Sequence, residues 1–242
     1  ERSGPGDALN PSQKKTENNT DEYNENRPLP RFTLTAVDAP VQDSWIDLAR
    51  DRVMIITDDE RGVARLLRDK LTARGYAVVT LRWGKGSAEG EEKVYFLDHN
   101  YGEEIGNIVE SIRKQHGKVG GLIHLFPLKE CPSFTDIDLP GWTARIDYEV
   151  KSLFSLLKHL APDLTDAADK GGACVLSAVD MGGTFASGLS TNNTDFFPGH
   201  GGISGLLKTA AIELPGVRVK SVDLDAKEPV PEMADHLFKE IG

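Results

Sequence analysis

Acidic side chains fill a turn that is placed to bind phosphate. The turn reads Thr57-Asp58-Asp59-Glu60-Arg61-Gly62 and lies between an apolar run and a helical pattern. In nucleotide-binding sheets, glycines at this turn let backbone amides approach the phosphates at the positive N-terminus of the helix. Here the early glycines are missing, and each carboxylate about 4 Å from a phosphate would cost roughly 1–4 kcal/mol. We therefore predict that the carboxylates cap the helix themselves and that no nucleotide binds. The residues of this degenerate turn are Thr57, Asp58, Asp59, Arg61 and Gly62.

Other residue types that could do chemistry lack the spacing for it. Ser177, His200 and Asp180 could form a hydrolase triad, but no Gly-x-Ser-x-Gly turn surrounds any serine. The six histidines include no pair at metal-ligand spacing, so we expect no metal site. His99 and His200 are expected in loops, with Gly199-His200-Gly201-Gly202 forming a loop that enters a helix, and His124 is expected to be a hydrogen-bonded core residue.

Strands and helices alternate in the predicted structure from Arg52 onward. Continuous apolar runs, typical of strands buried on both faces, occur at 53–57, 77–81, 94–97, 121–126, 173–177 and 217–224. Helical spacing of apolar residues occurs at 63–71, 105–112, 142–160, 203–214 and 233–241. This alternation predicts an α/β fold with a doubly wound, mostly parallel sheet of about six strands. A ligand would be expected at the carboxyl ends of the strands. No further strand pattern follows, so the sheet is expected to be truncated or completed by other sequence.

The N-terminal region has a different composition. Residues 1–30 are polar and contain almost no large apolar side chains, which is typical of a flexible linker, and a linker at this position suggests a piece of a longer polypeptide. Arg31–Val37 alternates with period two and predicts one extra strand before the main fold. The main domain is therefore predicted over residues 31–242.

Composition excludes several classes of protein. The chain has 242 residues, a formal net charge of −10 and a pI near 5.1, which disfavour binding to nucleic acid or to an acidic membrane surface. No apolar run approaches the roughly 18 residues of a membrane span. Cys131 and Cys174 cannot form a disulfide framework and are expected to be apolar fillers, which favours a cytoplasmic protein.

The order and spacing of these elements resemble a known family. The motifs on which the resemblance rests are Arg31–Pro40, Leu122-Ile123-His124, Val175-Leu176-Ser177-Ala178 and the run Gly202–Asp223. Together they resemble the ketoreductase region of type I polyketide and polyunsaturated fatty acid synthases, from Arg31 to the C-terminus. In that region two Rossmann-like, short-chain dehydrogenase/reductase folds follow each other. The first is a degenerate structural subdomain and the second is catalytic.

The resemblance implies that the catalytic residues have been lost. A reductase of this family needs a tyrosine to protonate the carbonyl, a serine that binds the same oxygen, and a lysine. The serine position matches Ser177, whereas the tyrosine position falls on Gly201 and the position four residues later falls on Gly205. The ketoreductase lysine position falls on Glu149, and no tyrosine occurs after Tyr148.

Two residues resemble cofactor contacts of active relatives. Arg82 follows the second predicted strand, where ketoreductases often place an arginine against the 2′-phosphate of NADPH. Asp98, after the third strand, resembles the aspartate that touches the adenine. We interpret both as vestigial, because neither can bind a cofactor where the binding site for its pyrophosphate is missing.

The resemblance implies the non-catalytic structural half of a ketoreductase. Such a subdomain binds no cofactor itself and stabilises a catalytic fold that reduces a β-ketoacyl group with NADPH. Its partners would be that catalytic subdomain, other synthase domains and, indirectly, an acyl carrier protein whose phosphopantetheine arm holds the substrate. We expect an exposed apolar patch where the catalytic fold docks. Two alternatives stay open: a stand-alone pseudo-reductase that serves as a docking or scaffold module, and an active oxidoreductase with atypical residues such as Ser177 and His200.

Overall fold

The structure is a computed structural model of residues 1–242. It describes residues 48–86, 93–98, 102–130, 132–187, 196–225 and 227–241, together with Val37 and Ala39. The linker predicted over residues 1–30 lies outside the described residues, and so does the strand predicted over 31–37 apart from Val37. His99 and Cys131 also lie outside them.

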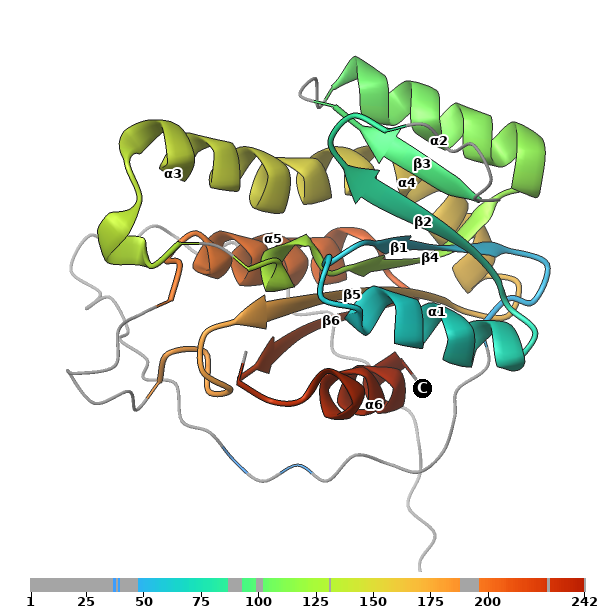
Figure 1. The fold of residues 1–242 in the computed structure, drawn as a ribbon. Coiled ribbons are helices and arrows are strands. Elements are labelled where there is room, and N and C mark those ends of the chain that lie inside the picture. Colours follow the sequence, from blue (N-terminus) through green and yellow to red (C-terminus); the bar gives the residue numbers. More distant parts are fainter. Residues whose placement is uncertain are drawn as a thin grey trace, which may run out of the picture. The chain divides into compact units, whose positions relative to one another are not determined.

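Six parallel strands form one sheet, as the sequence predicts (Figure 1). Their spatial order is β3-β2-β1-β4-β5-β6, and every neighbouring pair is parallel. Every residue of β1 and β4 is buried, because helices cover both faces of the sheet. The doubly wound α/β fold is confirmed. The strands are β1 (Val53–Thr57), β2 (Ala77–Trp83), β3 (Val94–Leu97), β4 (Val119–His124), β5 (Ala173–Asp180) and β6 (Val217–Leu224).

The helices form one layer on each face of the sheet (Figure 1). Helices α1 (Val63–Ala73) and α6 (Val230–Ile241) share one core with Met54 and Ile56 of β1. Helices α2 (Glu103–His116), α4 (Ser152–Ala168) and α5 (His200–Glu213) share the other core with Val53 and Ile55. Successive side chains of a strand point to opposite faces, so each apolar run serves both cores.

The long helix predicted over 142–160 differs from the structure in length and in form. It begins with α3 (Leu139–Arg145), passes through a π-helical turn, η3 (Ile146–Lys151), and continues as α4 to Ala168. Asp138 starts α3 by accepting a hydrogen bond from the Gly141 amide at 2.8 Å. Apolar periodicity marks the buried stripe of a helix but not its caps, so the predicted ends fell inside the observed ones.

Glycines lie at the end of α1 and at the start of α5. Gly75 follows α1 with a φ of +86°, the left-handed conformation that a helix C-terminus favours. The loop predicted at Gly199–Gly202 is wrong, because His200, Gly201 and Gly202 form the first turn of α5. Two further short turns, η1 (Phe126–Leu128) and η2 (Phe134–Asp136), lie between β4 and α3.

The strand order reverses between β1 and β4. The chain winds from β1 to β2 and β3 on one side and from β4 to β6 on the other. Doubly wound sheets bind ligands outside the carboxyl ends of the strands at this reversal. Thr57, His124 and Asp180 end β1, β4 and β5, so they lie along this edge.

Candidate functional site

The N-terminus of α1 is filled by the Asp59 carboxylate. Its two oxygens accept hydrogen bonds from the amides of Arg61 at 3.2 Å, Val63 at 3.1 Å and Ala64 at 2.7 Å. Asp59 is fully buried. These are the amides that a phosphate would use at a nucleotide-binding turn. The turn reaches this geometry through left-handed backbone at Glu60 (φ +58°) and Gly62 (φ +108°).

Asp58 turns toward the neighbouring strand. Its carboxylate accepts a hydrogen bond from the Nε of Arg82, at the end of β2, at 2.8 Å. It also accepts one from the Glu60 amide at 3.1 Å. Arg82, the residue that resembles a 2′-phosphate contact, is therefore held by the chain's own carboxylate. The turn's three carboxylates were predicted to cap α1, but only Asp59 contacts the helix amides, whereas Glu60 pairs with Lys129 at 2.5 Å.

Asp98 also has partners within the chain. Its amide donates to Glu104 of α2 at 3.0 Å, and its carboxylate lies 3.4 Å from the Lys85 ammonium. Asp98 thus ties the end of β3 to the start of α2.

Thr57 joins the ends of β1 and β4. Its hydroxyl oxygen accepts hydrogen bonds from the amides of Leu125 at 2.6 Å and Phe126 at 3.1 Å, and it is fully buried. Arg61 reaches the same segment, with its Nη1 3.4 Å from the carbonyl oxygen of Leu128. The degenerate turn is thereby fastened to η1.

Ser177 is buried in a pair with His124. The serine Oγ lies 3.0 Å from the Nδ1 of His124 across β4 and β5, and both residues are fully buried. Burial, together with the nearby charge of His200, lowers the pKa of His124 to about 3. His124 is thus neutral and packs edge-on against Phe126, with ring centroids 5.5 Å apart. The expectation of a hydrogen-bonded core histidine is confirmed.

Glu149, at the position implied for the ketoreductase lysine, lies in a buried ion cluster with Arg145 and His200. The Nε of Arg145 is 2.7 Å from Oε1 of Glu149, and the Nε2 of His200 is 2.9 Å from Oε2. None of the three residues is more than 9% exposed. The Arg145 guanidinium also lies 4.0 Å above the ring centre of Phe197. The sequence pattern placed His200 in a loop, whereas the structure buries it at the start of α5.

Gly201 and Gly205, at the positions that the resemblance implies for the catalytic tyrosine and for the residue four further on, face open space. A Cβ added at Gly201 or Gly205 would meet no atom within 4 Å, and both glycines are exposed on α5. The triad alternative finds no geometric support, because His200 contacts the main-chain oxygen of Asp180 at 3.2 Å while Ser177 contacts His124.

A second carboxylate, missed by the sequence analysis, organises the loop after β5. Asp223 of β6 accepts hydrogen bonds from the amides of Met181 and Phe185, each at 2.6 Å. Burial raises the pKa of Asp223, although the amides of this loop act to lower it. Left-handed backbone at Gly182, Gly183 and Phe185 lets the amides converge. The Gly182-Gly183 pair was the available signal in the sequence.

The described ranges contain neither a metal-binding cluster nor a membrane-spanning helix. No three His, Cys, Asp or Glu side chains gather there as a metal ion would require. Burial raises the pKa of the Cys174 thiol to about 12, so this residue is an inert core side chain. None of the helices in the described part of the chain is long and apolar enough to cross a bilayer.

The fold resembles that of short-chain dehydrogenases/reductases. No family model matches the chain, and no curated protein does. Aldohexose dehydrogenase from Thermoplasma acidophilum superposes with a TM-score of 0.54 at 16% identity, over 72% of this chain and 67% of that one. The 3-ketoacyl-(acyl-carrier-protein) reductase from Brucella melitensis, complexed with NADH, gives 0.56 at 18% identity, over 70% and 74%.

A third similar structure is an NADPH-bound short-chain oxidoreductase from Pseudomonas aeruginosa with an atypical catalytic center. It gives a TM-score of 0.56 at 17% identity, over 73% of this chain and 71% of that one. At these identities the likeness establishes the fold, a Rossmann-like sheet of the short-chain dehydrogenase/reductase type.

Proposed function

We propose that this chain is the non-catalytic structural half of a ketoreductase from a type I polyketide or polyunsaturated fatty acid synthase-like enzyme. In this role it binds no nicotinamide cofactor and packs against a catalytic reductase fold. That fold would reduce a carrier-bound β-ketoacyl group with NADPH. The observation that carries the proposal is the Asp59 carboxylate on the first amides of α1.

Asp59 opposes nucleotide binding in two ways. It uses the amide donors that a pyrophosphate needs, and its negative charge would repel a phosphate by about 1–4 kcal/mol at 4 Å. It is also fully buried, so it cannot swing away without leaving the Val63 and Ala64 amides unpaired.

The position of the reaction centre supports the same role. Ser177 is fully buried against His124, and Glu149 replaces the implied lysine inside an ion cluster. A carbonyl substrate could not reach the Ser177 hydroxyl without displacing these side chains. The proton donor of the family's chemistry has no equivalent, because Gly201 has no side chain.

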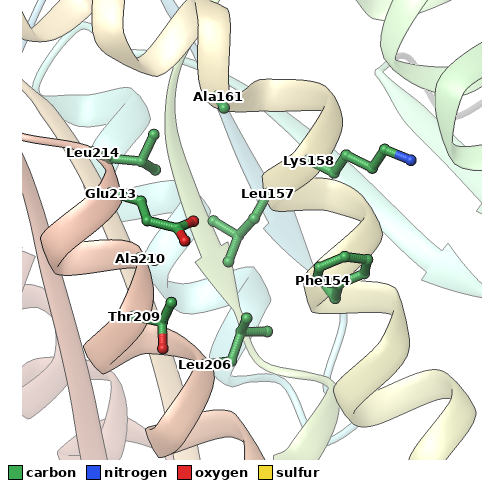
Figure 2. Close-up of a pocket in the computed structure, with 9 residues that line it drawn as sticks. All are labelled: Phe154, Leu157, Lys158, Ala161, Leu206, Thr209, Ala210, Glu213 and Leu214. Carbon is green, nitrogen blue, oxygen red and sulfur yellow. The ribbon is translucent and has the colours of Figure 1, made fainter.

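An apolar groove between α4 and α5 is the surface that we assign to the catalytic partner (Figure 2). It has a volume of about 200 Å³, and Leu157 and Leu206 point into it from the two helices. Phe154, 56% exposed, lines it from α4, and Ile212, 81% exposed, also lies on α5. Lys158 and Glu213 provide one charge of each sign at the groove. Exposed apolar side chains of this size favour contact with another protein.

Titration of the chain with NADPH tests the loss of the cofactor site. Followed by nucleotide fluorescence and by calorimetry, the titration is expected to show no saturable binding. The control is an active short-chain reductase under the same conditions. Saturable binding with micromolar affinity would overturn the proposal.

A binding assay tests the structural role. The chain is mixed with the reductase fold that the resemblance places after Gly242, and association is followed by calorimetry. Phe154→Asp is expected to weaken binding by at least about tenfold, because it places a charge in an apolar contact. The matched control is Leu139→Asp, which changes an apolar side chain that is 76% exposed on α3. Equal effects of the two variants would exclude the groove. Binding only to another synthase domain would favour the scaffold alternative.

A further inference from the structure

His200 makes two hydrogen bonds that require it to donate from both ring nitrogens. Its Nδ1 lies 3.2 Å from the main-chain oxygen of Asp180, and a carbonyl oxygen can only accept. Its Nε2 lies 2.9 Å from Oε2 of Glu149. Arg145 donates to the other oxygen of Glu149 at 2.7 Å, so the carboxylate accepts from Arg145 on one side and faces His200 on the other. A neutral imidazole has one N–H and can satisfy only one of these two acceptors.

We propose that His200 is held as an imidazolium in the folded protein and that its charge state controls how firmly the π-helical turn η3 is joined to the first turn of α5. With both protons, His200 bridges Glu149 of η3 and the end of β5. After the loss of one proton, either the buried Glu149 oxygen or the Asp180 carbonyl loses its donor. The contact between η3 and the first turn of α5 then weakens as the pH rises. This property is separate from the proposed structural role and would hold for either docking partner.

The surrounding groups support a single extra charge at this position. Among the described residues, the titratable groups around His200 are Glu149 of η3, which it contacts, Arg145 of α3, which contacts the same carboxylate, and His124 of β4. Phe197 lies edge-on to the His200 ring at 5.7 Å, and its face receives the Arg145 guanidinium. A second buried imidazolium next to His200 would be repelled, and the pKa of His124 is lowered to about 3. The two buried histidines therefore take opposite charge states.

The backbone of η3 makes its contact with α5 sensitive to the loss of one hydrogen bond of His200. The π-helical turn spans Ile146–Lys151 and includes Glu149, within a helix that is otherwise α-helical. Such turns are rare and persist where tertiary contacts favour them. The buried ion cluster is the tertiary contact that Glu149 makes.

NMR of the full chain labelled with ¹⁵N-histidine tests the charge state directly. Between about pH 5 and pH 9 the ring nitrogens report whether each histidine carries one proton or two. We expect His200 to keep both protons at a pH where the same chain, unfolded in urea, has largely lost one. We expect His124 to keep a single proton down to the lowest pH at which the chain stays folded. A single-proton tautomer of His200 at neutral pH would overturn the proposal, and this measurement needs no variant.

Hydrogen exchange tests the consequence for η3. Exchange rates are divided by the intrinsic rates at each pH, and the amides of α6 serve as the internal reference. At pH values where His200 has lost one proton, the amides of η3 are expected to exchange at least roughly tenfold faster than at pH values where it carries two. The loss of one charge-assisted hydrogen bond implies a change of this size. Glu149→Gln is expected to abolish this pH dependence. Glu213→Gln, which changes an exposed carboxylate on α5, is expected to keep it. Unchanged protection of η3 in the wild-type chain across the titration would refute the coupling.

Discussion

Removal of the Asp59 carboxylate is expected to destabilise the fold by about 2–4 kcal/mol. Truncation of a helix-capping side chain typically costs about 1 kcal/mol. The attraction between a buried carboxylate and the helix dipole adds up to about 2 kcal/mol. Asp59→Ala also leaves the Arg61 amide without its acceptor, since one carboxylate serves three amides. For a chain of 242 residues, this range corresponds to a loss of roughly 5–15 °C in Tm.

Urea unfolding of matched variants isolates this effect. Asp59→Asn keeps the shape and one oxygen acceptor, so it should lose about half as much stability as Asp59→Ala. Asp58→Ala is the control, because Asp58 forms a partly exposed pair with Arg82 that is worth about 1 kcal/mol or less. The free energies of unfolding are compared at equal m-values. If Asp59→Ala falls within about 0.5 kcal/mol of Asp58→Ala, the account of the α1 terminus is wrong.

Three further predictions concern the same edge of the sheet. Below about pH 6.5 the unfolded chain takes up a proton at His124 and the folded chain, with a pKa of about 3, does not. Measured as the difference between the wild-type chain and His124→Asn, urea unfolding should therefore show a loss of about 2 kcal/mol between pH 7 and pH 5; a difference that does not change with pH would contradict this. Thr57→Val leaves two buried amides without an acceptor, so the free energy of unfolding should fall by about 1–3 kcal/mol. Thermal unfolding should show a lower Tm for this variant and little change for Thr165→Val, which alters an exposed side chain. Asp223→Asn should speed proteolysis of the loop at Met181–Ser187 by roughly tenfold, and an equal effect of the exposed Asp225→Asn would exclude a specific role.

The sheet could be predicted from the sequence because its signal is local. The run Val94–Leu97 has the same bounds in the sequence prediction and in β3, and Val217–Leu224 has the same bounds as β6. A strand buried on both faces needs an unbroken apolar run, and such a run is visible without knowledge of its neighbours. The acidic turn before α1 was also local, so the capping by Asp59 could be anticipated.

The buried polar groups could not be predicted, because their partners are distant in the sequence. His124 and Ser177 are separated by 53 positions, and Glu149 and His200 by 51. Glycines on both sides of His200 favour a loop by composition, but burial of the imidazole against Glu149 outweighs that preference. The π-helical form of η3 was equally hidden, because the buried positions Arg145, Glu149 and Ser152 around this turn are polar and give no apolar signal.

Under the proposed function, two separate sets of contacts block the carboxyl edge of this sheet. At the phosphate end, Asp59 occupies the helix amides and Asp58 holds Arg82. At the reaction end, Ser177 is paired with His124 inside the core, and Gly201 supplies no proton donor. A substitution that removes one set of contacts leaves the other set in place, because the two sets share no side chain. An Asp59→Gly variant that recovered affinity for NADPH would therefore still reduce no β-ketoacyl group, and cofactor binding and reduction are expected to separate in this fold.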